Sequence, residues 1–93
     1  MAKNLRVEQS QTGTWIVRGD SDRFGQDAVL YEHYNQQSAE NWAYEQFLNA
    51  EFDNAVCRPF VSRTLRTALM NQFRISEAKA IDVVEGYLFK EVR

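Results

Sequence analysis

The chain is poor in the residues that build covalent links, metal sites and active sites. Its 93 residues include one cysteine, Cys57, and one histidine, His33. A single thiol excludes an internal disulfide, and one thiol with one imidazole is too few for a zinc ligand set. Catalysis needs several titratable groups that converge in space, and no such constellation is visible in the sequence. We therefore expect no metal, no cofactor and no enzyme activity.

Long apolar runs are also absent. No segment reaches the roughly 18 consecutive apolar residues that span a bilayer, and residues 1–6 contain no apolar run of the kind found in secretion signals. The sequence thus predicts a soluble protein with no membrane partner. Because its only thiol has no partner within the chain, we expect a reducing, cytoplasmic location.

What the chain does have is a division of charge. Residues 1–54 carry four basic and nine acidic side chains, whereas residues 55–93 carry seven basic and four acidic ones. The net charge of −2 hides a segment of −5 followed by a segment of +3. A dipolar distribution of this kind favours oriented binding to a charged macromolecule.

Alternation with period two dominates the first third of the chain and predicts strands at about 4–10, 14–19 and 28–34. The connection between the second and third strands is dense in turn-forming residues, so we expect a loop over 19–27. Together these segments predict an antiparallel meander.

Helical signals follow the meander. We expect Ser38 to cap a first helix, Arg58-Pro59 to start a second and Ser76 to cap a third. Gly86 lies inside the third helix, where glycine is unfavourable, and would mark an early end or a close helix contact. The most regular apolar stripe lies in the second helix, and its four members are expected to face the core: Val61, Leu65, Leu69 and Phe73.

The predicted fold class is α+β, a three-stranded antiparallel β-meander followed by three helices (βββααα), the last two as a helical hairpin. A single domain is expected over 1–93, made of a meander (1–35), a helix (36–54) and a basic helical hairpin (55–93). The strands and first helix resemble, in pattern, small strand-strand-helix domains of uncharacterised bacterial and phage proteins. No specific motif supports that resemblance, so no family is assigned.

Four basic residues of the hairpin form a candidate partner-binding patch: Arg63, Arg66, Arg74 and Lys79. The short connection 71–76 resembles the turn of a helix-turn-helix regulator, whose second helix enters the major groove of DNA. That second helix here carries three acidic residues that phosphate repels: Glu77, Asp82 and Glu85. An ordinary helical hairpin is the alternative.

Twelve aromatic residues are many for a chain of this size, and aromatics left at the surface are typical of protein–protein hot spots. Trp42 and Phe52 fall outside the apolar stripe of the first helix, so we predict that both contact a partner. A fully used core with a few aromatics at its rim is the alternative.

Two short motifs receive structural interpretations. Arg18-Gly19-Asp20 matches the tripeptide of integrin ligands, but we interpret it as a strand end that runs into a turn. Asp20, Asp22 and Gly25 match the start of a calcium loop, which Phe24 and Tyr31 interrupt at ligand positions. We expect a solvated acidic loop there, and a half-buried, hydrogen-bonded role for His33.

These patterns predict a non-enzymatic binding module, an adaptor or inhibitor that occupies a charged surface of a macromolecular partner. Protein is the favoured partner, and a homodimer is one form that it can take. The alternative is a small nucleic-acid-binding regulator that uses the helix pair.

Overall fold

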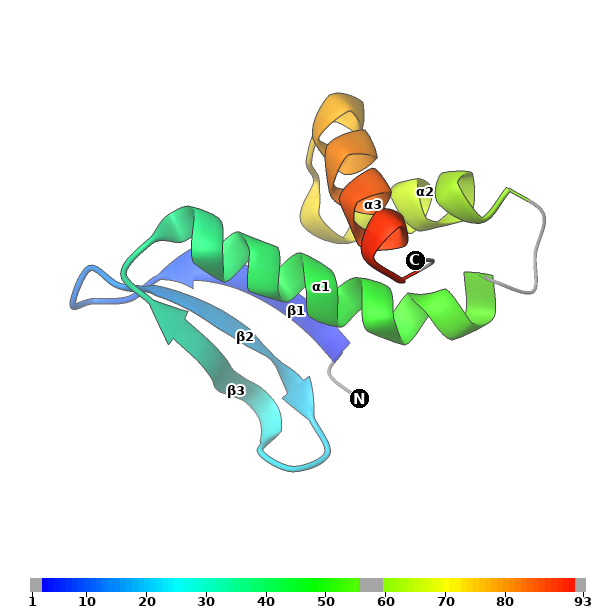
Figure 1. Cartoon of the computed structure of the whole chain (residues 1–93). Helices are drawn as coiled ribbons and strands as arrows, with labels where there is room; N and C mark the ends of the chain where they lie inside the picture. The colour runs from blue at the N-terminus through cyan, green and yellow to red at the C-terminus, as the bar shows by residue number, and fades with distance from the viewer. Residues whose placement is uncertain (1–2, 56–59, 92–93) are drawn as a thin grey trace. The chain divides into compact units, whose positions relative to one another are not determined.

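The computed structural model describes residues 3–55 and 60–91 (Figure 1). Its elements are three strands and three helices: β1 (Lys3–Gln9), β2 (Trp15–Ser21), β3 (Gly25–His33), α1 (Gln36–Ala55), α2 (Val61–Phe73) and α3 (Glu77–Glu91). The predicted α+β class and the order βββααα are confirmed. No helix within these residues is both long and apolar enough to cross a bilayer. The predicted helix start at Arg58-Pro59 and the thiol of Cys57 lie outside the described residues.

The strands form one antiparallel sheet in the order β1-β2-β3. Val17 in the central strand pairs with Val7 on one side and with Tyr31 on the other. The predicted bounds of the loop over 19–27 are wrong, because β2 continues to Ser21 and β3 begins at Gly25. Ser21 and Gly25 are paired across the two strands. Gly25 has a φ of 88°, a left-handed value that glycine adopts without strain, so three residues suffice to reverse the chain.

The chain divides into two compact units, Met1–Phe47 and Leu48–Arg93, with the boundary inside α1. In the first, the N-terminal unit, the opening turns of α1 lie against one face of the sheet (Figure 1). The fully buried side chains of this unit come from both layers: Leu5, Val17, Ala39 and Ala43.

The N-cap of the first helix lies three residues earlier than predicted. Asn35 Oδ1 accepts hydrogen bonds from the backbone N–H groups of Gln37, at 2.8 Å, and Ser38, at 3.2 Å. Asn35 is therefore the N-cap, and the prediction of Ser38 is wrong. Asn35 is held in turn by His33, whose Nδ1 accepts from the Asn35 N–H at 2.9 Å. His33 is half-buried and hydrogen-bonded, as expected.

The second, C-terminal unit has its own core. It consists of side chains from the end of α1, from α2 and from α3: Leu48, Ala55, Leu65, Leu69, Ala80, Val84 and Tyr87. The predicted burial of Leu65 and Leu69 is confirmed, since each is 0% exposed, while Val61 and Phe73 are half-buried. Apolar spacing in α2 thus fixes which side of this helix packs inward and which side remains for solvent.

Helices α2 and α3 pack against each other across a connection of three residues, 74–76. Ser76 caps α3 as predicted, because its Oγ accepts from the Lys79 N–H at 3.2 Å. Gly86 neither ends α3 nor permits a close contact: the helix continues to Glu91, and a Cβ built on Gly86 would meet nothing within 4 Å. The expectation for Gly86 is therefore wrong.

Candidate binding surface on α2

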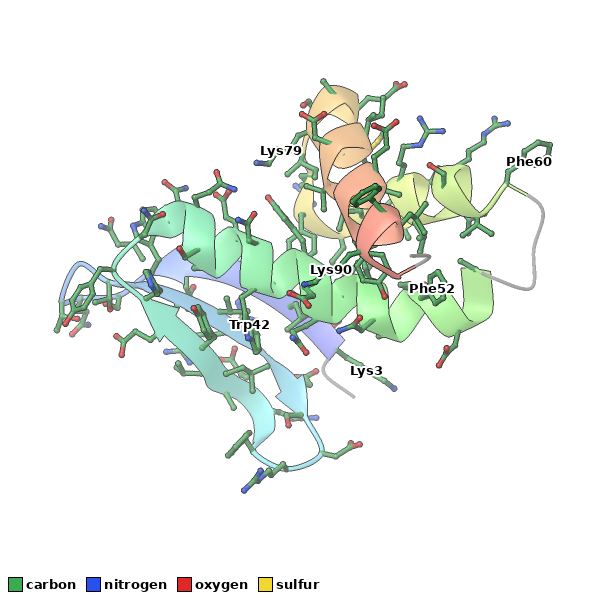
Figure 2. All side chains as sticks on the ribbon, in the orientation of Figure 1. Lys3, Trp42, Phe52, Phe60, Lys79 and Lys90 are labelled. Carbon is green, nitrogen blue, oxygen red and sulfur yellow. The ribbon has the colours of Figure 1, made fainter. Side chains whose placement is uncertain are left out.

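Segment 60–74 exposes a single face. Its exposed residues follow one another at intervals of three or four: Phe60, Arg63, Thr67, Asn71 and Arg74. In a helix with 3.6 residues per turn, these intervals place Arg63, Thr67 and Asn71 along one line, and Phe60 and Arg74 flank that line at the N-cap and C-cap. We call this set the α2 stripe. Figure 2 shows the Phe60 ring at the start of α2, projecting away from the helix.

Both ends of the α2 stripe have left-handed backbone. Phe60, the N-cap residue, has φ 61° and ψ 52°, and Arg74, the C-cap residue, has φ 54° and ψ 41°. Glycine is the residue that this conformation favours, and another L-residue there costs about 1–2 kcal/mol. The cap bond uses only backbone, from the Arg74 N–H to Met70 O at 2.8 Å. The Phe60 and Arg74 side chains are not required to hold this backbone conformation, which suits a role in contacts with another molecule.

A small pocket lies beside the stripe. It has a volume of about 150 Å³ and is lined by four residues of α2 and one of α3: Arg63, Arg66, Thr67, Met70 and Glu77. Drug-sized ligands need about 300–1,000 Å³, so this pocket suits the end of one side chain. The structure thus brings together Arg63 and Arg66, two members of the predicted basic patch.

The charged side chains of α2 are all basic. The helix contains no acidic residue. Arg66 Nε donates to Ser62 O at 3.4 Å, and no carboxylate in the described parts of the chain pairs with Arg63, Arg66 or Arg74. These three guanidinium groups are available to an external anion.

In the sheet of the N-terminal unit, by contrast, arginines form ion pairs with carboxylates. Arg6 forms an ion pair with Asp27, and Arg18 pairs with Glu8 at 2.5 Å. Arg6 and Arg18 lie directly opposite each other on neighbouring strands, so these carboxylates offset a repulsion between like charges. Among the described residues, these two arginines are thus offset by carboxylates, whereas Arg63 and Arg66 of α2 have no ion pair.

The remaining predicted basic residue and the acidic residues lie on α3. Lys79 is half-buried and does not line the pocket, whereas Arg74 lies on the same stripe as Arg63. Glu77, Asp82 and Glu85 are exposed on α3. The second helix of the pair therefore presents acidic groups to solvent, and the first helix presents basic ones.

The two aromatic residues predicted to bind a partner each have a partner within the fold. Trp42 stacks on Tyr31, with ring centroids 4.9 Å apart and planes 9° from parallel. Phe52 meets Tyr87 edge to face at 5.9 Å. Both are half-buried. The large exposed aromatics are others: Phe24, Tyr34, Phe60 and Phe89.

Phe60 belongs to the candidate surface, and sequence analysis did not select it. The intervals from Phe60 to Arg74 are readable in the sequence, but the exposure of this line depends on which side of α2 packs inward. The 74% exposure of Phe60 is thus a finding of the structure.

The short motifs near the second strand are part of the sheet. Gly19 is buried in β2, and Asp20 Oδ2 accepts from Asn4 Nδ2 at 2.7 Å while its Oδ1 accepts from the Asp27 N–H at 3.0 Å. The tripeptide of Arg18, Gly19 and Asp20 lies at the end of β2, directly before Ser21 and the turn at 22–24, as expected. Across the described ranges, no three His, Cys, Asp or Glu side chains come close enough to hold a metal ion.

Comparison with known proteins adds no family to this description. No protein-family model, curated protein or solved structure matches the chain. The α2 stripe, its backbone and its charge are the observations from which we infer a function.

Proposed function

We propose that this chain is a non-enzymatic binding module, an adaptor or inhibitor, that docks the α2 stripe on an acidic surface of a protein partner. The left-handed backbone at Phe60 and Arg74 is the observation that carries the proposal. Two exposed side chains occupy positions where the fold favours glycine, and they flank the exposed residues of α2 at its two ends. Its single thiol suits a reducing cytoplasm, where we place the protein.

The composition of the α2 stripe suits a protein interface. Aromatic and arginine residues dominate hot spots, and the arginine fork matches a carboxylate with two parallel hydrogen bonds. Exposed ion pairs alone contribute only about 0–1 kcal/mol each, so an apolar anchor is needed. Phe60, three residues from Arg63, supplies that anchor, while Thr67 and Asn71 add hydrogen-bonding groups between the two arginines.

Nucleic acid is the second candidate partner. Arginine, asparagine and threonine also contact phosphates and base edges, and the α2 stripe contains all three. The helix that would enter the groove in a helix-turn-helix is α3, however, and its exposed carboxylates repel phosphate. A nucleic acid would have to contact α2 while avoiding Glu77 in the neighbouring pocket. The charge distribution therefore favours a protein over a nucleic acid as the partner.

A second copy of the chain can supply the acidic surface. Helix α1 contains four acidic residues and no basic one: Glu40, Glu45, Glu51 and Asp53. An acidic helix and a basic helix on the same chain can make two equivalent contacts in a symmetric dimer. Light scattering at low and high salt tests this form, which predicts that mass falls as salt rises.

Charge reversal tests the proposal directly. A tagged chain is used to capture partners from native lysate, with and without nuclease treatment. Arg63→Glu with Arg66→Glu should abolish capture, whereas Asp82→Lys with Glu85→Lys should retain it, because the control reverses two exposed charges on α3. If both double variants still capture a partner after nuclease treatment, the proposed role of α2 is wrong. If nuclease treatment abolishes capture by the wild-type chain, nucleic acid is favoured as the partner.

A further inference from the structure

The pocket beside the α2 stripe has a defined charge. Arg63 and Arg66 contribute two positive charges and Glu77 one negative charge, which leaves a net charge of +1. One carboxylate neutralises that charge. A phosphate monoester carries about −1.5 to −2 at neutral pH and would leave excess negative charge beside Glu77. The pocket is therefore matched in charge to a singly charged anion.

The other lining residues suit a carboxylate side chain. The guanidinium groups of Arg63 and Arg66 are donors only, and no carboxylate in the described residues occupies them. Thr67 adds a hydroxyl donor, and Met70 gives an apolar wall against which methylene groups pack. A side chain with an apolar stem and a carboxylate at its end meets each of these groups.

We propose that this pocket receives one aspartate or glutamate side chain of the partner, and that Glu77 sets a preference for carboxylate over phosphate. The inference rests on the proposed function, because the α2 stripe brings the acidic segment to the pocket.

Glu77 also stabilises α3, and the test must separate this structural role from its role in selecting the bound group. It is the first residue of α3, where the positive end of the helix dipole stabilises a carboxylate. Glu77→Gln keeps the shape of the side chain and removes its charge. Glu85→Gln is the matched control, since Glu85 is an exposed acid of the same helix that does not line the pocket. The unfolding midpoint of each variant shows whether α3 remains folded.

Fluorescence anisotropy with three labelled peptides measures the preference. The probes are an alternating glutamate–serine peptide and two counterparts of equal length, with glutamine or phosphoserine in place of every glutamate. Wild type should bind the glutamate peptide most tightly. Glu77→Gln should raise affinity for the phosphoserine peptide about tenfold and for the glutamate peptide about threefold or less. The reason is that a phosphate carries more negative charge than a carboxylate and is therefore repelled more strongly by Glu77. Glu85→Gln should change both affinities equally and little.

Several outcomes would overturn the inference. It is wrong if wild type prefers the phosphoserine peptide, if the glutamine peptide binds as well as the glutamate peptide, or if Glu77→Gln strengthens both charged peptides by the same factor. Failure of every peptide to bind also contradicts it. The capture experiment with the α2 double variant separates these results from the proposed function, because that function stands if charge reversal on α2 still abolishes capture.

Discussion

Phe60 and Arg74 occupy opposite ends of α2 with the same left-handed backbone, and both side chains are exposed. A helix that ends in this conformation usually has glycine there. Retaining a large aromatic ring at one end and a guanidinium group at the other lowers stability and places two typical interface side chains at the two ends of the helix that carries Arg63. This relationship is the basis of the proposed binding surface.

Replacing Arg74 with glycine should separate stability from binding. We expect Arg74→Gly to leave the free energy of unfolding unchanged or to raise it by up to about 1 kcal/mol, because relief of the left-handed strain exceeds the added freedom of the unfolded chain. Urea denaturation measures the change. Arg74→Ala is the control, since it removes the side chain and keeps the strain. A clear loss of stability in Arg74→Gly would show that the arginine side chain supports the fold.

Truncating the centre of α2 should destabilise the C-terminal unit. Leu69 is 0% exposed, so Leu69→Ala is expected to lower the free energy of unfolding by about 2–5 kcal/mol through lost burial and a residual cavity. The exposed neighbour Thr67→Ala should change it by less than about 0.5 kcal/mol. Equal denaturation midpoints for the two variants would mean that α2 faces the other way.

A methyl group should have opposite effects at Gly19 and Gly86. A Cβ on Gly19 would lie 2.9 Å from Leu5 Cδ2 and 2.9 Å from Lys3 O, and the backbone oxygen cannot move aside cheaply. Gly19→Ala is therefore expected to lower the melting temperature. Gly86→Ala meets open space in α3 and should stabilise by up to about 1 kcal/mol through helix propensity. Thermal unfolding by circular dichroism compares both, and a change of the same sign contradicts this reading.

Alkaline pH should weaken the fold through Tyr44. Burial, and secondarily the Glu40 carboxylate, raise the pKa of Tyr44 from 10.0 to about 12. The phenol holds its proton more tightly in the folded chain, so its contribution to stability is complete below pH 10 and is lost between pH 10 and about 12. Urea denaturation in this range should show a smaller fall in stability for Tyr44→Phe than for wild type. Tyr34→Phe, at an 88% exposed position, should follow wild type.

Local patterns predicted the order of the elements, because period two, period 3.6 and cap residues act over a few neighbours. The cap at Ser76 and the burial of Leu65 and Leu69 followed from them. The start of α1 did not, since Asn35 and Ser38 are both good caps, and the hydrogen bond from the Asn35 N–H to His33 is not encoded in cap propensity.

Some features of the structure have nonlocal causes that the sequence does not show. The loop over 19–27 is shorter than predicted because the Asp20 carboxylate binds the Asp27 N–H across the sheet. Trp42 falls outside the apolar stripe of α1, yet it is half-buried by stacking on Tyr31. Spacing in one helix cannot show a ring on a distant strand, and it cannot show the left-handed backbone at Phe60.

The most direct test combines the two ends of the α2 stripe in one variant, Phe60→Gly with Arg74→Gly, compared with wild type in partner capture and in urea denaturation. If the stripe is the binding surface, this variant should be at least as stable as wild type and should lose the nuclease-resistant protein partner. A variant that is equally stable and captures the same partner in the same amount would contradict the proposal.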